Sequence, residues 1–203
     1  MRALDALKAG QVALVCTDTV YGLAAVPGTP GYERIFELKQ RPHDQVLPWL
    51  VDGPDALDVY ACDVPDYARK LARAFWPGAC TLVVHASRAA RELGGVAADG
   101  TVALRCPDDE SCRILLSALD VPIACTSANV HGQPACSRKE QLPEAFSALP
   151  GFDEAAERCS GGSASTIVEC TSAAPRLLRS GPIPVALVRE VSGIDGTLPA
   201  YVR

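Results

Sequence analysis

The sequence predicts an α/β protein, in which helices pack against a sheet. Short apolar runs that fit buried strands alternate with segments whose apolar residues recur at helical spacing. Two strand candidates end in small hydroxyl and amide side chains, at residues 17–23 and 126–129, and the end of a strand is a usual ligand-binding place in this class. The chain has 203 residues, 48% of them hydrophobic, which is enough for one core. We therefore expect a single domain over residues 1–203.

The first half of the chain is predicted to begin with a short helix around Leu4 that ends at Gly10. Thr29 can cap a later helix with Pro30 at its first position, and Pro42 ends that helix because proline lacks the N–H that a helix interior needs. The predicted strands here are 12–16 and 46–51, and the predicted helices are the N-terminal one, 30–41, one that begins near residue 54, and 66–76.

The second half continues the alternation of strands and helices. Its predicted strands are 81–84, 101–105, 122–125, 165–169 and 176–179, and its predicted helices are 109–119 and 138–149. The remaining residues, 182–203, contain Pro182, Pro184 and Pro199 and are too short and interrupted for a second domain. We expect them to form a C-terminal tail packed on the core.

Charge and patterning exclude several classes of protein. The net charge of −5 argues against a surface wrapped around a nucleic acid backbone, although a local basic cleft is compatible with it. Charged residues interrupt the apolar positions of residues 1–10, which fits neither a signal peptide nor a membrane span. We expect a cytoplasmic protein that does not associate with membranes.

The cysteines and histidines do not form a recognisable metal or nucleophile motif. The nine cysteines contain no Cys-x-x-Cys pair, and their odd number and apolar surroundings indicate reduced thiols. His43, His85 and His131 have no cysteine or carboxylate at metal-ligand or catalytic-triad spacing. Gly161-Gly162 lacks the following Gly-Lys-Ser or Gly-Lys-Thr of a P-loop and indicates a flexible turn. We expect no protein-held metal and no covalent nucleophile.

Three polar segments are candidates for ligand binding, and each also has a simpler explanation. Residues 17–19 can form a cap or a turn. Lys39 and Arg41, at the end of a predicted helix, can bind phosphates or can complement the helix dipole alone. Ser127 and Asn129 can bind a ligand or only stabilise a turn. Each segment by itself leaves both explanations open.

Taken together and in order, these segments resemble the YrdC-like family of threonylcarbamoyl-AMP synthases over nearly the whole chain. The matching segments are 17–23 (Thr-Asp-Thr-Val-Tyr-Gly-Leu), 39–42, 76–78, 81–82, 102–105, 126–129, 132–134, 165–168 and 178–181. The resemblance implies a twisted sheet of parallel and antiparallel strands flanked by helices, with a concave basic cavity. It is to the short, single-domain form of the family.

The resemblance also implies an enzyme, a nucleotidyltransferase that condenses L-threonine, bicarbonate and ATP into threonylcarbamoyl-AMP and pyrophosphate. Mg²⁺ is implied to accompany the ATP. The product is implied to pass to a separate threonylcarbamoyl transferase that modifies adenosine 37 of tRNA (t6A), and direct contact with tRNA is left open. Displacement at phosphorus needs positioning and neutralisation of charge more than a covalent nucleophile.

The resemblance assigns two groups of site residues. Lys39 and Arg41 are implied to bind the ATP phosphates and to stabilise charge during the reaction, and Arg105 to pair with the carboxylate of threonine. The other positions implied for ATP are Gln45, Thr101, Ser127, Asn129, Ala135 and Arg179. The other positions implied for L-threonine are Thr19, Cys125 and Ser165.

Three positions depart from the family pattern. Gln45 stands where many members have lysine, so we expect weaker affinity for ATP. Leu50 stands where some members have a histidine near threonine. Ser180 stands where the family has proline, which changes the stiffness of the loop more than its charge.

Two alternative functions remain open. One is a related enzyme that adenylates a different carbamoyl group, and the other is a non-catalytic module whose cavity binds RNA. Domains of the first kind are usually embedded in longer chains. The acidic net charge and the complete set of motifs count against the second.

Overall fold

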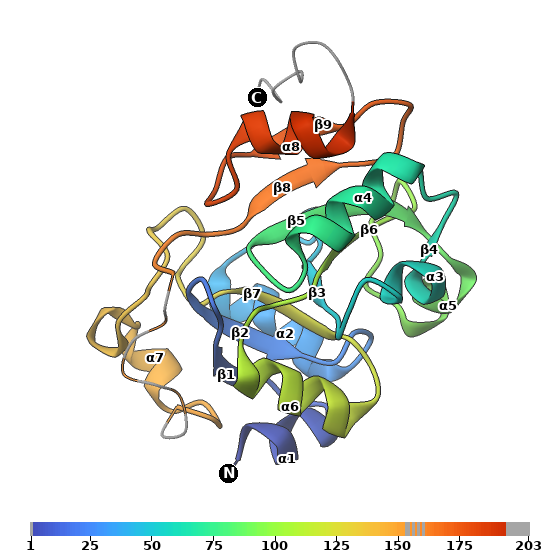
Figure 1. Ribbon diagram of the computed structural model, residues 1–203. Helices are drawn as coiled ribbons and strands as arrows, with labels where there is room; N and C mark the ends of the chain where they lie inside the picture. The colour runs from blue at the N-terminus through green and yellow to red at the C-terminus, as the bar shows by residue number, and fades with distance from the viewer. Residues whose placement is uncertain (1, 153–154, 156, 158, 160, 194–203) are drawn as a thin grey trace.

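The computed structural model describes residues 2–152, 155, 157, 159 and 161–193, and there it shows one large sheet flanked by helices (Figure 1). Its strands are β1 (Ala13–Cys16), β2 (Tyr21–Ala25), β3 (Trp49–Leu50), β4 (Ala61–Cys62), β5 (Cys80–Ala86), β6 (Thr101–Arg105), β7 (Ile123–Ser127), β8 (Thr166–Glu169) and β9 (Arg176–Arg179). Its α-helices are α1 (Ala3–Lys8), α2 (Pro30–Lys39), α3 (Ala56–Tyr60), α4 (Asp66–Phe75), α5 (Arg88–Leu93), α6 (Glu110–Leu119), α7 (Glu144–Ser147) and α8 (Val185–Ser192). The predicted α/β class is confirmed.

The sheet is mixed, as the resemblance implies. Its strand order is β1-β2-β7-β3-β6-β5-β8-β9, and β4 pairs with β5 outside this path. The pairs β3/β6 and β5/β8 are parallel, and the other neighbouring strands are antiparallel. The N-terminal strands β1 and β2 and the C-terminal strands β8 and β9 therefore lie at opposite edges of one sheet, and strands distant in sequence, such as β2 and β7, are neighbours between them.

Alternating side chains divide this sheet into two faces. In β6, Val102 and Leu104 belong to the larger core, which also takes apolar side chains from α2, α3, α4, α5 and α8. A smaller core lies under α1 and α6, which run side by side along β1 (Figure 1). Farther along the sheet, side chains at alternate positions of β5, β6 and β8 face a cavity rather than packing against a helix.

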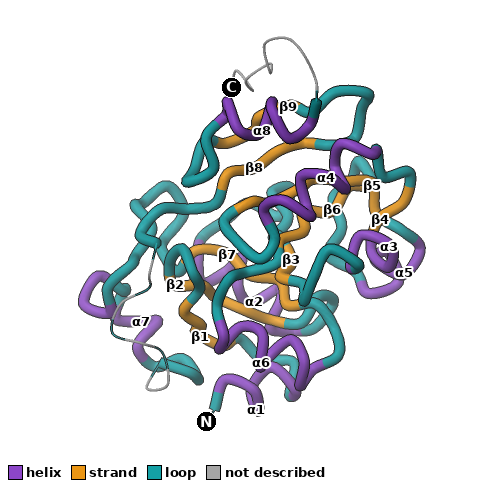
Figure 2. Tube along the Cα trace, in the orientation of Figure 1, coloured by secondary structure: helices purple, strands orange, loops and turns teal. Residues whose placement is uncertain are grey.

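Several elements differ from the predictions. Strand β2 was not predicted, because all five of its residues are buried and it shows no alternation of polar and apolar positions. The short elements β4 and α5 were not predicted either. The predicted helix over 138–149 is wrong, since Pro143 separates a 3₁₀ turn at Lys139–Gln141 from the short helix α7. Figure 2 shows the β7–β8 connection as mostly loop.

The predicted strand over 46–51 is shortened to β3. The carbonyl groups at its start accept hydrogen bonds from a side chain instead of from a neighbouring strand. Arg41 donates from Nε to the carbonyl of Gln45 at 2.8 Å and from a terminal nitrogen to that of Val46 at 3.3 Å. Pro48 has no N–H to offer to a neighbouring strand. The strand pairs with β6 and β7 at Trp49 and Leu50, and one backbone hydrogen bond follows on each side, from Cys125 to Pro48 and from Val51 to Arg105.

Part of the predicted C-terminal tail is helical. Helix α8 packs against α4, and its Val188 is fully buried. Residues 194–203 lie outside the described residues, and the single-domain organisation stays a prediction. In the part of the chain that the structure describes, no helix has the length and apolar character needed to cross a membrane.

The expectation that all nine cysteines are reduced is wrong for one pair. Cys16, at the end of β1, forms a disulfide with Cys159, and their Cα atoms lie 5.7 Å apart. The partners are separated by 143 residues, so no short spacing motif could reveal them. The other seven cysteines are free, and Cys62 is the one among these seven that is not buried.

We expect this disulfide to appear in a peptide map of the protein purified without reductant. Alkylation in denaturant, followed by proteolysis and mass spectrometry, should find the Cys16 and Cys159 peptides linked and the other seven cysteines alkylated. The same map after reduction is the control. Alkylation of both Cys16 and Cys159 without reduction would show that the thiols are not paired.

Candidate functional site

The largest concentration of predicted site residues lies in a cavity of about 350 Å³ on the sheet face described above. Nine of the twelve predicted positions line it: Thr19, Arg41, Gln45, Thr101, Arg105, Cys125, Ser127, Ser165 and Arg179. They come from loops and strands that are distant in sequence and are brought together by the strand order. Lys39, Asn129 and Ala135 do not line this cavity. The roles of all twelve in binding ATP or L-threonine stay predictions.

The loop between β1 and β2 is organised by Thr17, a buried residue that was not among the twelve predicted site positions. Its Oγ1 donates to the carbonyl of Val20 at 2.8 Å and accepts from the N–H groups of Thr19 and Val20 at 3.1 and 3.2 Å. Because that single proton is used, the 2.8 Å contact between the two threonine hydroxyls has Thr19 as the donor. The Thr19 oxygen is then left as an acceptor facing Arg105.

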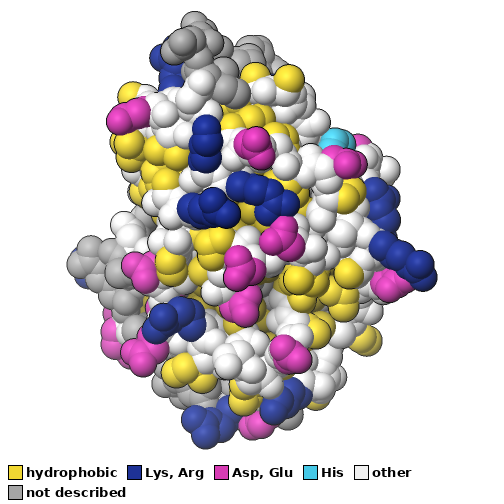
Figure 3. Space-filling view, turned by 45° about the vertical axis from the view of Figure 1, so that its right-hand side comes forward, with side chains coloured by type: hydrophobic (Ala, Val, Ile, Leu, Met, Phe, Trp, Pro, Cys, Tyr) yellow, Lys and Arg dark blue, Asp and Glu magenta, His cyan; other side chains and the backbone are white. Residues whose placement is uncertain are grey.

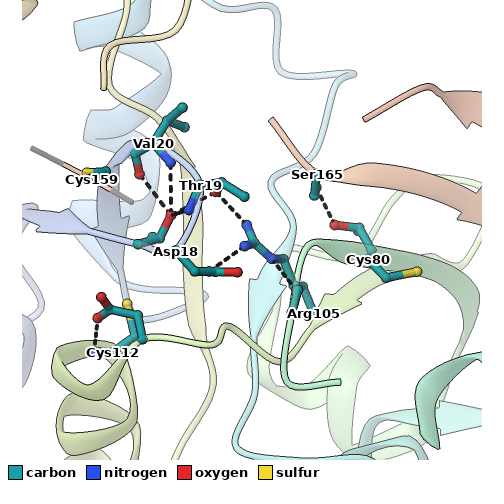
Figure 4. A network of polar contacts seen from close by, with 12 residues as sticks. Asp18, Thr19, Val20, Cys80, Arg105, Cys112, Cys159 and Ser165 are labelled. Atoms are coloured by element: carbon teal, nitrogen blue, oxygen red, sulfur yellow. Dashed lines mark hydrogen bonds and ion pairs between the residues drawn. The ribbon is translucent and has the colours of Figure 1, made fainter. Parts of the chain in front are cut away.

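Arg105, at the end of β6, is fixed by three acceptors (Figure 4). Its Nε donates to the carbonyl of Gly78 at 3.0 Å, one terminal nitrogen to Oγ1 of Thr19 at 2.9 Å, and the other to Oδ1 of Asp18 at 2.5 Å. A guanidinium has five N–H groups, so these contacts leave one on each terminal nitrogen. That pair suits a planar anion such as a carboxylate.

A second arginine of the cavity, Arg179 of β9, is held by Ser165. It donates from Nε to the carbonyl of Ser165 at 2.9 Å and from a terminal nitrogen to its hydroxyl at 3.1 Å. The same hydroxyl lies 2.8 Å from Oγ1 of Thr81, which was not predicted as a site residue. Burial lowers the pKa of Arg179, and repulsion from Arg105 and Arg41 lowers it further. Arginine nevertheless stays charged, so this wall keeps its positive charge.

Arg41 supplies the third guanidinium of the cavity. Its Nε and one terminal nitrogen are used by the loop carbonyls of Gln45 and Val46, as described above, which leaves its other terminal nitrogen for a ligand. Burial lowers the pKa of Arg41. Asp44 also lines the cavity near it, so the lining residues combine three arginines with one carboxylate.

Lys39 lies behind the cavity wall. It is only 2% exposed, and its ammonium donates to the carbonyl of Ser127, to the carbonyl of Asn129 at 2.7 Å and to Oδ1 of Asn129 at 3.3 Å. These contacts use all three of its N–H groups. Burial, followed by repulsion from Arg41, lowers its pKa to about 8. In this structure Lys39 therefore fastens the segment that follows β7.

Asn129 and Ala135 line a neighbouring pocket of about 320 Å³. The amide nitrogen of Asn129 donates to the carbonyls of Val130 and Gln133 at 2.9 and 2.7 Å, which closes the loop after β7. Both predicted nucleotide positions are therefore next to the cavity without being part of its wall.

The floor of the cavity contains the apolar positions Cys125 and Leu50. Burial raises the pKa of the Cys125 thiol to about 12, so it stays protonated and is a poor nucleophile. Gly22 of β2 is required beside it, because a Cβ there would lie 2.4 Å from the Cys125 sulfur. No group of three or more His, Cys, Asp or Glu side chains in the described part of the chain could hold a metal ion.

The signals for the residues that were missed are partly visible in the sequence. Thr81 follows the strand alternation that also exposes Val83 of β5 to the cavity. Thr17 and Asp18 stand inside the motif at residues 17–23, but the contacts of Thr17 with Thr19 and of Asp18 with Arg105 of β6 follow only from the folded loop and sheet.

This fold and this cavity define an α/β protein with a cavity lined by three arginines and several hydroxyls, a set suited to a ligand with anionic groups. The family model Sua5/YciO/YrdC, described as telomere recombination, matches residues 5–181. A putative threonylcarbamoyl-AMP synthase from Mycobacterium leprae is 39% identical over 198 residues, which cover 95% of this chain and 87% of that protein. The chain belongs to the Sua5/YciO/YrdC family.

Two comparisons concern an archaeal relative. The threonylcarbamoyl-AMP synthase from Pyrococcus abyssi is 33% identical over 190 residues, which cover 92% of this chain and 55% of that protein. The crystal structure of P. abyssi Sua5 complexed with L-threonine superposes with a TM-score of 0.83 at 31% identity, covering 98% of this chain and 58% of that one. This chain therefore spans little more than half the length of the archaeal relative.

Proposed function

We propose that this chain is a threonylcarbamoyl-AMP synthase, which converts L-threonine, bicarbonate and ATP into threonylcarbamoyl-AMP, pyrophosphate and water. Relatives that match most of the chain carry this name, and one of them has a structure with L-threonine. The observation that carries the proposal is the cavity itself, where Arg41, Arg105 and Arg179 meet the hydroxyls of Thr19 and Ser165. A reaction that joins an amino acid and bicarbonate to the α-phosphate of ATP needs such a set of positive and polar groups in one space.

The two ends of the cavity suit the two substrates. Arg105 has one N–H left on each terminal nitrogen and stands beside Thr19, which fits the carboxylate of L-threonine. Arg41 and Arg179 come from other walls and fit the phosphates of ATP, and Ser127 can contribute its hydroxyl. Lys39 acts on the nucleotide end through Ser127 and Asn129.

The chemistry divides into two steps. The amine of threonine adds to the carbon of bicarbonate, with loss of water, and forms a carbamate. A carbamate oxygen then attacks the α-phosphorus of ATP, the bond to the β-phosphate breaks, and pyrophosphate leaves with the electron pair. The residues named here bind and orient the substrates, and the guanidiniums neutralise the charge that develops on phosphate oxygens.

Mg²⁺ enters this proposal as a companion of the triphosphate, which is how it is usually held in nucleotide sites. The described residues contain no group of three metal-ligating side chains, so no step is assigned to a protein-held metal. The product is proposed to pass to a separate transferase that acts on tRNA. Direct binding of tRNA stays open, and on the face in Figure 3 basic and acidic side chains are interspersed rather than segregated.

The test is pyrophosphate release from ATP in the presence of bicarbonate, with and without L-threonine. Release that requires both L-threonine and bicarbonate supports the synthase, and mass spectrometry should then detect threonylcarbamoyl-AMP. Release that requires carbamoyl phosphate instead would identify the related carbamoyl-adenylating enzyme. Tight RNA binding without release would identify the binding module. D-Threonine is the matched control ligand.

Position 45 offers a separate prediction for the nucleotide end. Gln45→Lys places a cation at a cavity wall that already contains Arg41, and it should tighten ATP binding about two- to fivefold at low salt. Calorimetry at two salt concentrations measures this, and the gain should shrink at the higher one. Gln45→Met, which changes the side chain without adding charge, is the control. Weaker binding by Gln45→Lys would place the phosphates away from this position.

A further inference from the structure

We propose that Asp18 is a positioning residue for substrate binding, whose carboxylate holds the Arg105 guanidinium in the orientation that receives the carboxylate of the amino acid. The inference rests on the proposed function, because it concerns the same end of the cavity. It assigns a role to the second residue of the Thr-Asp-Thr segment, for which neither the sequence motifs nor the cavity lining gave one.

The contact between the two side chains is short and shielded from water. Oδ1 of Asp18 lies 2.5 Å from a terminal nitrogen of Arg105, and the two side chains are only 10% and 8% exposed. Hydrogen bonds between charged groups are stronger and more directional than neutral ones. This pair is therefore suited to fix an orientation, unlike the exposed ion pairs elsewhere on the surface, which contribute little.

Asp18 acts through Arg105 rather than on the ligand. Thr17, Thr19 and Arg105 line the cavity, whereas Asp18 between the two threonines does not. A substrate in the cavity would meet the remaining N–H groups of Arg105 with Asp18 behind them. A planar guanidinium forms two parallel bonds to a carboxylate only when its plane is set correctly, so prior orientation reduces the entropy lost on binding.

The backbone that carries Asp18 is itself held from two sides. Thr17 organises the loop from within, and the Gly161-Gly162 turn packs against it from outside. The N–H of Gly162 donates to the carbonyl of Thr19 at 2.6 Å, and a Cβ on Gly161 would lie 2.4 Å from the carbonyl oxygen of Asp18. The carboxylate is thus presented to Arg105 from a closely packed loop.

The experiment compares L-threonine with L-threoninol, which lacks the carboxylate, by calorimetry on the full chain. The wild type should bind L-threonine more tightly. Asp18→Ala should reduce that preference about 10- to 100-fold, mainly through loss of L-threonine affinity, and leave L-threoninol binding unchanged. Asp18→Asn keeps an acceptor oxygen near Arg105 and should retain part of the preference. Glu169→Gln, which alters a second carboxylate–arginine pair at 2.5 Å outside the cavity, should behave as wild type.

The outcomes separate the two proposals. If the wild type does not prefer L-threonine over L-threoninol, the assignment of Arg105 in the proposed function fails. If the wild type shows the preference and Asp18→Ala keeps it, the positioning role of Asp18 is excluded. Equal weakening of both ligands in Asp18→Ala, or failure of both Asp18 variants to fold, assigns the carboxylate a structural role alone and also overturns the proposal.

Discussion

Replacing Arg105 with alanine should lower kcat/KM for L-threonine by about 100- to 1,000-fold, because two charge-assisted hydrogen bonds to the substrate carboxylate are lost. The KM for ATP should change little, since the phosphates are assigned to Arg41 and Arg179. The same substitution removes the counterion of the nearly buried Asp18, at a cost of up to about 3–5 kcal/mol in the free energy of unfolding. Pyrophosphate release at varied L-threonine, together with denaturant unfolding, measures both effects.

The control for this prediction is Arg176→Ala. Arg176 pairs with Glu169 at 2.5 Å, but its side chain is 43% exposed and does not line the cavity. Its loss should leave the kinetics for L-threonine unchanged. The double variant Arg105→Ala with Asp18→Asn should recover part of the stability without recovering activity, because the charge of Asp18 is removed while the cation that binds the substrate is still missing. An Arg105→Ala protein with normal L-threonine kinetics would place the amino acid elsewhere.

Replacing Lys39 with methionine should destabilise the protein by about 2–4 kcal/mol, because the carbonyls of Ser127 and Asn129 lose their charged donor in a place that water does not reach. The KM for ATP should also rise, since the segment after β7 is then less well fixed. Arg41→Ala should raise the KM for ATP with a smaller loss of stability. Denaturant unfolding and ATP titration of the two variants distinguish these effects.

The matched control for Lys39→Met is another lysine of the chain. Lys139→Met removes a lysine that binds Ala155 and Glu157 outside the cavity, and it should leave the ATP kinetics unchanged.

The pH dependence of unfolding gives a second test of Lys39. Burial lowers the pKa of Lys39 from 10.5 to about 8, so the unfolded protein binds more protons between these pH values. The unfolding free energy of the wild type should therefore rise with pH in this window relative to Lys39→Met. If Lys39→Met keeps full stability and loses only ATP binding, Lys39 contacts the phosphates directly.

Much of the fold could be predicted because strands and helices have local signatures. The apolar run before Thr17 and the alternation in β6 each identify a strand from a few neighbouring residues. Strand β2 escaped because it is buried on both faces, and the 138–149 region misled because the break at Pro143 outweighs its helical spacing. Elements whose pairing depends on distant chain segments carry no such local mark.

The candidate site shows the same division. Nine of the twelve predicted positions line one cavity, because the motifs mark the ends of strands that the sheet brings together. Lys39 and Arg41 are only two residues apart and look equivalent in the sequence. The fold places Lys39 behind the cavity wall and Arg41 in the wall, because helix α2 ends at Lys39 and the chain changes direction before Arg41.

The sequence by itself determined the α/β class, the family and most of the polar groups that line the cavity. Only the tertiary structure decided the disulfide between Cys16 and Cys159, the burial of Lys39 and the contact of Asp18 with Arg105. The physical reason is that the effect of a charge or a thiol depends on its partners and on its access to water. Both are set by contacts between segments that lie far apart in the chain.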